Sequence, residues 1–576
     1  MTAGHEKSQA SRWSHGKIVE LFGADLRSLA AFRVVLGLLV LADLASRATD
    51  LRAHYTDAGV LPRTVLLEEV LSRWAFSLNL MNGEAYFQAL LFGAAAVAAL
   101  GMLVGYRTRL MTIVAWVLLL SIQWRNPLIL NSGDVLLRML LFWGMFLPLG
   151  AYWSVDRVLK AAPARVSMRF LSGATVALFM QIALMYWFTT MLKSAPEWRA
   201  DGAAIYYALA ADQFATPIGA YLDHFPELLT VMTFATVGLE AFGPFLLFFP
   251  FFTGPVRTVT VLAFMNLHFG IWLTMNVGLF SWTSALCMVC FLPTWFWEKA
   301  TRLRHALPER SNLPRATKLA VARLARDYWS PVGERLSRMA GLRQPSVVGL
   351  SAQDDNGLVN HAVRMVPPPP VTLPTESAHR GETTAGAEER HDAAAEPKPT
   401  MLRSSLATSL VALLFLTYVF FWNLSGVSSF QMPERLVPLG PLLGLDQYWA
   451  MFAPHPPKGD VWHVIPGNLQ DGQEVDLLPV ASGDFSLHEL SWQKPPRARD
   501  LYKNEHWRKY MENLGNDQFT SQRLYFGRYV CREWNARHTG AEQLRSFQIM
   551  QMWQPTLPDN RQPASQKTVL WEHHCF

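Results

Sequence analysis

The sequence predicts an all-α membrane bundle of about eight spans, followed by a ninth span that carries a small exported α+β domain. Composition is the first reason: 51% of the 576 residues are hydrophobic and only 17% are charged, against about 25% charged in ordinary soluble domains. The second reason is the recurrence of apolar runs of about 20 residues, the length that crosses a bilayer. The third is the chain after residue 423, where short alternating segments are separated by turn residues.

Eight candidate spans precede residue 300, and a ninth follows a long polar segment. The candidates lie near 29–47, 85–104, 109–124, 127–150, 171–193, 226–250, 257–276, 279–297 and 404–423. The third and fourth are the weakest, because Trp124, Arg125 and Asn126 give only a short polar break between them.

Loop charge predicts the orientation of these spans. Basic residues gather in 1–28, in the loops after the second and fourth spans, and in 298–403. Eight spans place all of these on the cytoplasmic side, as the positive-inside rule requires. The loop 48–84, which carries Arg52, Arg63 and Arg73, opposes the trend. We therefore expect residues 424–576 on the exported side.

The predicted domains follow from these boundaries. They are a cytoplasmic segment at 1–28, the bundle at 29–297, a second cytoplasmic segment at 298–403, the ninth span at 404–423 and the exported domain at 424–576. Within the second cytoplasmic segment, 300–345 is typical of basic amphipathic helices that lie on anionic lipid. Residues 346–400 are rich in Ala, Glu, Thr and Pro, a composition that predicts a disordered linker.

The exported domain is predicted to combine strands and helices. We expect strands at Val461–Pro466 and Glu474–Leu478, helices at 502–514 and 520–537, and a hairpin of Phe547–Trp553 with Thr568–Glu572. Because exported compartments are oxidising, we expect a disulfide between Cys531 and Cys575. Cys287 and Cys290 lie inside the eighth span, where we expect small buried apolar residues. The aromatic run 447–456 favours a membrane interface over a ligand groove.

Ionisable residues inside spans need an explanation, because charge in a bilayer is costly. Arg33 and Asp43 are too far apart on one helix to pair, so each needs another partner. Arg47 closes the first span and can reach the membrane surface. Asp134 and Arg138 are spaced i, i+4, which predicts an ion pair.

Lys193 ends the fifth span and allows two interpretations. It can extend to the interface, or it can be buried, which favours a neutral amine that acts as a base near pH 7. Glu240 and His268 lie on the sixth and seventh spans, and we expect them to bond each other, Arg138 or a backbone carbonyl. His54 can line a site or face water; we expect it to face water, next to a turn at Asp57.

Several common sites have no counterpart in the sequence. It contains no phosphate-binding loop, no dinucleotide fingerprint and no zinc spacing of Cys and His, so we predict no metal. The net charge of +6 comes from basic residues spread over loops rather than one patch, so no nucleic-acid partner is expected.

Four stretches, in this order, resemble the HTTM superfamily, which includes the vitamin K-dependent gamma-glutamyl carboxylases. They are His54–Pro62, Tyr152–Asp156, Lys193–Trp198, and His268 with Gly278–Trp282. Together they cover roughly residues 20–297, and their joint order is more specific than any one of them.

The resemblance implies a site and its cofactor. In the carboxylases a lysine deprotonates vitamin K hydroquinone, with oxygen and carbon dioxide as co-substrates, and a glutamate is carboxylated. Lys193 is similar to that lysine, and His268 has an implied positioning role. Trp198, Asn276 and Trp282 would line the quinol site, or anchor at the interface.

The sequence also departs from the carboxylases. Leu192 stands where the animal enzymes have a second lysine, and Asn131–Asp134 lacks the histidine of their fourth-span region. The long linker and ninth span are also unlike the animal enzymes.

Three functions follow as competing hypotheses. The first is a quinol-dependent carboxylase-like enzyme of a bacterial inner membrane, acting on an exported peptide or protein. The second is a maturation factor for a secreted peptide toxin without carboxylase chemistry, as some bacterial superfamily members are. The third is a lipid-binding or transport protein, with Asp134, Arg138, Glu240 and His268 along a polar path. Substrate and oligomeric state stay open.

Overall fold

The computed structural model describes residues 16–159, 167–306, 402, 404–557 and 563–575. Most of these lie in one compact unit, Met1–Thr301 with Lys398–Phe576. The linker predicted at 346–400, and nearly all of the basic stretch at 300–345, lie outside the described residues, so those predictions are not tested.

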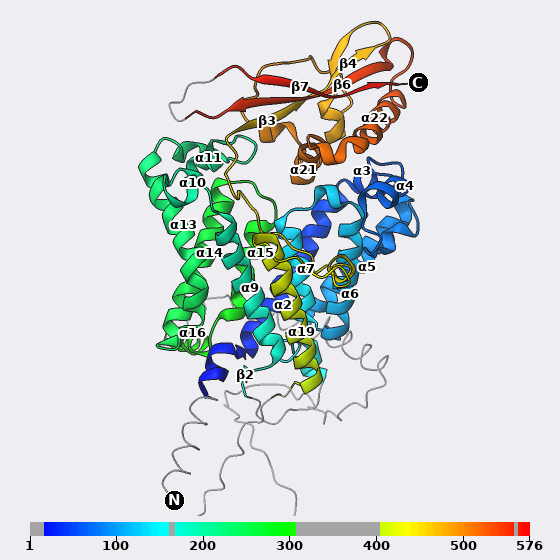
Figure 1. The fold of residues 1–576 in the computed structure, drawn as a ribbon. Helices are drawn as coiled ribbons and strands as arrows, with labels where there is room; N and C mark the ends of the chain where they lie inside the picture. Colours follow the sequence, from blue (N-terminus) through cyan, green and yellow to red (C-terminus); the bar gives the residue numbers. More distant parts are fainter. Residues whose placement is uncertain (1–15, 160–166, 307–401, 403, 558–562, 576) are drawn as a thin grey trace, which may run out of the picture. The chain divides into compact units, whose positions relative to one another are not determined.

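Six described helices are long and apolar enough to cross a membrane. They are α2 (Leu26–Ala48), α5 (Ala85–Val104), α9 (Gly173–Leu192), α13 (Pro226–Leu247), α14 (Thr253–Thr274) and α19 (Leu406–Val427). A pair bent by 91°, Phe280–Phe291 with Thr294–Leu303, makes a seventh if it is counted as one span. These helices indicate a membrane protein. Helix α19 packs beside α9, although more than 200 residues separate them in the chain (Figure 1).

The predicted third, fourth and eighth spans are not among these six helices. Helix α7 (Ser132–Gly144) has 13 residues, too few for the roughly 20 that cross a bilayer. It is almost wholly buried between α6 (Thr108–Arg125), α2 and α15 (Phe280–Cys287). The predicted eighth span breaks at Pro293, between η4 (Met288–Phe291) and α16 (Thr294–Ala306). The expected count of nine is therefore corrected to six or seven for the described residues.

Orientation depends on the number of crossings, so the exported side of the C-terminal domain stays a prediction.

Short elements connect the long helices. They are α3 (Leu51–Tyr55), α4 (Arg63–Val65), η1 (Leu66–Val70), η2 (Leu78–Leu80), η3 (Pro127–Ile129), α8 (Val155–Leu159), α10 (Pro196–Arg199), α11 (Ala204–Ala210), α12 (Pro217–Leu222), α20 (Leu439–Leu443), and the antiparallel pair β1 (Ala24–Asp25) and β2 (Arg169–Phe170).

The C-terminal domain (residues 428–575) is built on one antiparallel sheet. Its central strand β6 (Leu544–Pro555) pairs along one side with β7 (Gln566–His574), as Figure 1 shows. Along the other side it pairs first with β4 (Pro466–Leu469) and then with β3 (Gly459–Val464); β5 (Glu474–Asp476) follows β4. The predicted strands and hairpin are present. Gly467 lies within β4, where it pairs with Phe547.

Two helices support this sheet, as predicted. Helix α22 (Thr520–Asn535) packs on β6 and β7, and α21 (Glu505–Leu514) packs beside α22. The predicted disulfide is confirmed, since Cys531 of α22 is bonded to Cys575 after β7. The remaining elements are short turns of helix: η6 (Leu478–Ser482), η7 (Ala498–Leu501), η8 (Asp517–Phe519) and η9 (Gly540–Glu542).

The C-terminal domain packs directly on the helices. Asn513 of α21 donates a 2.6 Å hydrogen bond to the carbonyl of Leu128, and Asn504 donates one of the same length to Asp50. Trp507 of α21 lies against His54, with 4.3 Å between ring centroids. One buried apolar cluster runs through both parts, which holds α21 over the ends of α6 and α7.

Candidate functional site

The sequence-predicted base, Lys193, forms a buried ion pair. Its Nζ donates to both carboxylate oxygens of Glu240 in α13, at 2.8 and 2.6 Å. Lys193 is 5% exposed and Glu240 6%, so the lysine does not extend to the interface. The expectation that Glu240 bonds His268, Arg138 or a carbonyl is wrong, because α9 and α13 pack together and bring Lys193 to it. Such a pair offsets the cost of burying either charge.

Residues just after Lys193 hold and cover its amine. Pro196 begins α10 and turns the chain, and Arg199 then donates to the carbonyls of Lys193 and Thr190 at 2.7 and 2.5 Å. The ring of Trp198 lies over the amine, with 4.4 Å from Nζ to the ring centroid. The ring stabilises the ammonium by a cation–π contact and shields it from solvent.

His268 lies in the same buried region. Its Nε2 is 2.7 Å from the hydroxyl of Tyr186 in α9, and its Nδ1 has no hydrogen-bond partner among the described residues. Tyr186 precedes Lys193 by seven residues, about two turns of helix, so the two side chains leave α9 on the same side. We call Tyr186, Lys193, Glu240 and His268 the polar cluster. Three helices, α9, α13 and α14, contribute to it.

His268 also lines a small cavity between α14 and α15. This aromatic cavity has a volume of about 250 Å³ and is lined by Met265, Asn266, His268, Phe269, Trp272, Ser281, Trp282, Ala285 and Leu286. Trp272 and Trp282 contact each other, with ring centroids 5.1 Å apart, and are 42% and 36% exposed. The structure therefore brings together two predicted site residues, His268 and Trp282.

The other predicted cofactor residues lie elsewhere. Trp198 covers Lys193, as described. Asn276 lines a separate polar cavity of about 350 Å³ with Lys503, Glu505 and Arg508 of the C-terminal domain. No single cavity among those seen in the described residues contains Lys193, Trp198, Asn276 and Trp282 together.

A much larger cavity lies between the helices and the C-terminal domain. It has a volume of about 1100 Å³, and its walls come from the start of α7, one face of β3 and β6, helix α21 and the segment 446–459. We expected the aromatic run 447–456 at a membrane interface; instead, most of its residues line this cavity. Sequence reasoning also missed Arg508 and His463 in its wall. No local pattern marks them, because the cavity forms only when distant segments pack.

Helix α10 joins Lys193 to the wall of the large cavity. Trp198 Nε1 donates a 2.9 Å hydrogen bond to the carbonyl of Phe452, which lines that cavity. Glu197 pairs with Lys458 and lies 3.1 Å from His455 Nδ1, both also in the wall. The hydrogen bond from Lys458 lowers the pKa of Glu197 to about 2, so its carboxylate stays charged at neutral pH. Phe452 adopts a φ of 54°, a left-handed conformation that is strained for a bulky residue.

The charged residues of the first span form another buried network. Arg47 donates to Asp43 at 2.8 Å and to the hydroxyl of Tyr55 at 2.9 Å, and it pairs with Asp134. Arg47 therefore pairs inside the bundle rather than reaching the surface, and it is the partner that Asp43 needs. Arg33 donates a 2.6 Å hydrogen bond to the carbonyl of Trp153.

The predicted pair of Asp134 and Arg138 is wrong. Asp134 accepts from the backbone of Asn131 at the start of α7 and faces Arg47. Arg138 lies 3.0 Å from the carboxylate of Asp446. Asp134, Arg138 and the polar cluster are thus three separately paired groups, which is unfavourable for one continuous polar path.

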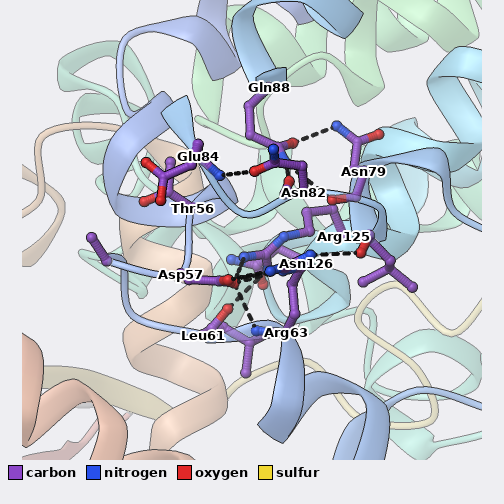
Figure 2. Close-up of polar contacts among 12 residues, drawn as sticks. Thr56, Asp57, Leu61, Arg63, Asn79, Asn82, Glu84, Gln88, Arg125 and Asn126 are labelled. Atoms are coloured by element: carbon purple, nitrogen blue, oxygen red, sulfur yellow. Dashed lines mark hydrogen bonds and ion pairs between the residues drawn. The ribbon is translucent and has the colours of Figure 1, made fainter. Parts of the chain in front are cut away.

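Asp57 holds the turn after the first span through ion pairs and hydrogen bonds with Arg63 (Figure 2). The carboxylate of Asp57 pairs with Arg63 at 2.8 Å and lies 3.6 Å from the guanidinium of Arg125. Arg125 in turn donates a 2.9 Å hydrogen bond to the carbonyl of Leu61. His54 is 1% exposed, so the expectation that it faces water is wrong. Burial lowers the pKa of His54 to about 3. These contacts shape the surface on which α21 packs and leave His54 beneath Trp507.

Comparison with known proteins adds one match. Residues 23–295 match the family model described as the HTTM domain. The match contains all four residues of the polar cluster and the aromatic cavity, and it ends before α19 and the C-terminal domain. No solved structure matches the chain. Among the described residues, no group of three or more His, Cys, Asp and Glu is arranged to hold a metal ion.

Proposed function

We propose that this chain, whose residues 23–295 match the family model of the HTTM domain, is a carboxylase-like membrane enzyme of the HTTM superfamily. Its substrate would be a glutamate in an exported peptide or protein. The observation that carries the proposal is the buried Lys193–Glu240 pair, which lies in one polar cluster with His268 of the aromatic cavity.

In this proposal, the Lys193–Glu240 pair is the proton acceptor. The pair is neutral overall whether its shared proton lies on the amine or on the carboxyl group. In the second arrangement Lys193 is a free amine and takes a proton from a bound hydroxyl group. Glu240 thus keeps the resting pair neutral, and the positive charge that the pair gains with the proton is balanced by the oxyanion left on the bound hydroxyl group.

The aromatic cavity fits the ring of a reduced quinone. Its volume of about 250 Å³ is slightly below the ~300–1,000 Å³ of small-molecule pockets, which suits a ring system whose tail stays outside. Trp272 and Trp282 supply aromatic walls, and their exposure leaves the tail a route to lipid. When bound, a reduced quinone would supply the electrons that reduce oxygen. This reaction would yield a base far stronger than an amine.

Tyr186 and His268 orient the ring. If the Tyr186 hydroxyl donates to Nε2, the imidazole proton is on Nδ1, and Nδ1 can donate to an oxygen in the aromatic cavity. This role explains why a buried ring nitrogen has no partner within the described protein.

The large cavity is the proposed place of the peptide. It is wide enough for several side chains, and its wall carries both cations and carboxylates: Lys458, Arg508, Lys509, Asp446, Glu505 and Glu512. Trp198, which covers Lys193, donates its hydrogen bond to Phe452 in the wall of this cavity, so movement of this pair would expose the amine to a bound peptide.

Labelled bicarbonate tests the proposed function. The full chain is incubated with reduced vitamin K or menaquinone and a glutamate-containing peptide, and the peptide is analysed by mass spectrometry. We expect label in the peptide, and none with Lys193→Ala. Lys17→Ala is the matched control, since it removes a half-exposed lysine that also pairs with a glutamate. Equal labelling by Lys193→Ala and the wild type would contradict the role of the lysine.

A second function has its own support. The C-terminal domain packs on the helices through Trp507 and Asn513, so this chain contains a docked, membrane-anchored domain. This favours a maturation factor whose partner is fused to it. If no peptide is labelled under any condition, we would adopt that function instead.

A further inference from the structure

A separate cavity lies at the opposite end of the helices from the large cavity. Its volume is about 500 Å³. Ser132, at the start of α7, lines the large cavity, whereas Met145, just after α7, lines this one. In the same way, Trp422 near the end of α19 lines the large cavity and Thr408 near its start lines this one. Since α19 is long enough to span a bilayer, this cavity lies at the level of lipid headgroups on one side.

Two arginines give this cavity an excess of positive charge. Arg109 is exposed and has no hydrogen bond or ion pair within the described residues. Arg157 donates one hydrogen bond of 2.9 Å to the carbonyl of Ala151, so most of the N–H groups of its guanidinium stay free. The cavity also contains Asp156, but its oxygens accept from the backbone N–H groups of Arg107 and Thr108 at 2.7 and 2.8 Å. That carboxylate therefore caps the start of α6, where the helix dipole stabilises it.

The rest of the lining is partly apolar. Met145, Phe146 and Leu402 contribute hydrocarbon surface, and Ser404 and Thr408 contribute hydroxyl groups. A free phosphate would use the arginines and hydroxyls but not the apolar wall. A phospholipid uses all three, because its glycerol and first acyl carbons lie next to its phosphate.

We propose that this cavity binds the headgroup of an anionic phospholipid, with Arg109 and Arg157 as the phosphate ligands. This site does not depend on the proposed enzymatic function, because it is remote from the polar cluster. Basic pockets between helices at the headgroup level are the usual form of such sites.

Native mass spectrometry of the purified full chain tests this proposal. Phosphatidylglycerol and phosphatidylcholine are added in equal amounts, and the bound lipid is counted for the wild type and for Arg109→Gln, Arg157→Gln and the double variant. We expect preference for phosphatidylglycerol, weakened about fivefold by each change and about 25-fold by both. Arg107→Gln is the matched control, since Arg107 lies at the same end but outside the cavity lining.

The outcomes separate the alternatives. Equal retention of both lipids, or an equal loss with Arg107→Gln, would overturn the proposal. Displacement of phosphatidylglycerol by an equal concentration of glycerol 3-phosphate would assign the site to a free phosphate and also overturn it. Because the Arg109 side chain has no partner within the described protein, Arg109→Gln should fold normally. An unchanged melting temperature for that variant, with weakened lipid binding, supports the proposal without the double variant.

Discussion

The indole nitrogen of Trp198 donates a 2.9 Å hydrogen bond to the carbonyl of Phe452. The residue that covers Lys193 is thereby attached to the wall of the large cavity. Trp198 thus contacts both the proposed base, Lys193, and Phe452 in the wall of the proposed peptide site.

Loss of this hydrogen bond should loosen the segment around Phe452. Trp198→Phe keeps an aromatic ring over Lys193 but removes the donor. A hydrogen bond of about 1 kcal/mol corresponds to about fivefold faster hydrogen exchange in 450–458. Trp187→Phe is the matched control, because the buried indole N–H of Trp187 has no partner among the described residues. Equal exchange in both variants would show that the bond does not hold this segment.

Removal of Glu240 should destabilise the bundle through Lys193. Glu240→Gln leaves a buried ammonium without its counter-charge, which costs about 3–5 kcal/mol. The double variant Lys193→Met with Glu240→Gln removes both charges and should recover much of that loss. Thermal unfolding in detergent measures the four members of this cycle. Additive effects of the two changes would contradict a direct pair.

Acid should destabilise the docked C-terminal domain. Burial lowers the pKa of His54 to about 3, of His506 to about 3 and of His463 to about 4. The unfolded chain takes up these protons near pH 6.5, whereas the folded chain does not. Below about pH 6.5 the unfolded state therefore binds more protons, and stability falls toward pH 4.

Melting temperature between pH 4.5 and 8 checks this dependence. We expect a plateau above about pH 7 and a steady fall below it, with a smaller fall for His463→Phe. His488→Phe removes an exposed histidine that pairs with Asp484, and it should leave in place the fall caused by the three buried histidines. A constant melting temperature from pH 5 to 7 would be inconsistent with buried neutral histidines.

Loss of the disulfide should weaken the C-terminal domain alone. Cys531→Ser or Cys575→Ser opens a link across 44 residues, and such losses cost about 2–5 kcal/mol. Thiol labelling with and without reductant detects the bond, and urea unfolding measures the loss. Cys287→Ala is the control, because Cys287 is a free buried thiol. Labelling of Cys531 without reductant would contradict the bond.

Features set by local sequence were predictable in this chain. The long apolar runs became α2, α5, α9, α13, α14 and α19, and the alternating segments became β3 and β6. The fourth span was not, because hydropathy does not distinguish a short helix buried in protein from one that crosses lipid. Residues 127–150 satisfy either description until α2, α6 and α15 surround α7.

The pairing of charges was not predictable for a related reason. Spacing i, i+4 placed Asp134 next to Arg138, but the actual partners come from 87 and 308 residues away. Lys193 illustrates the same limit, since its partner Glu240 lies on another helix. Its position in the chain identified it as a candidate base, but only the packing of α9 on α13 identified the group that keeps it buried.

Chemical rescue by small amines tests whether Lys193 is the base. Lys193→Ala is assayed for label from bicarbonate in the peptide, with and without small primary amines such as methylamine. We expect the variant to be inactive alone and added amine to restore part of the labelling, more strongly at a pH where the amine is neutral. Wild-type labelling by Lys193→Ala without any amine would contradict the claim that this lysine is the base.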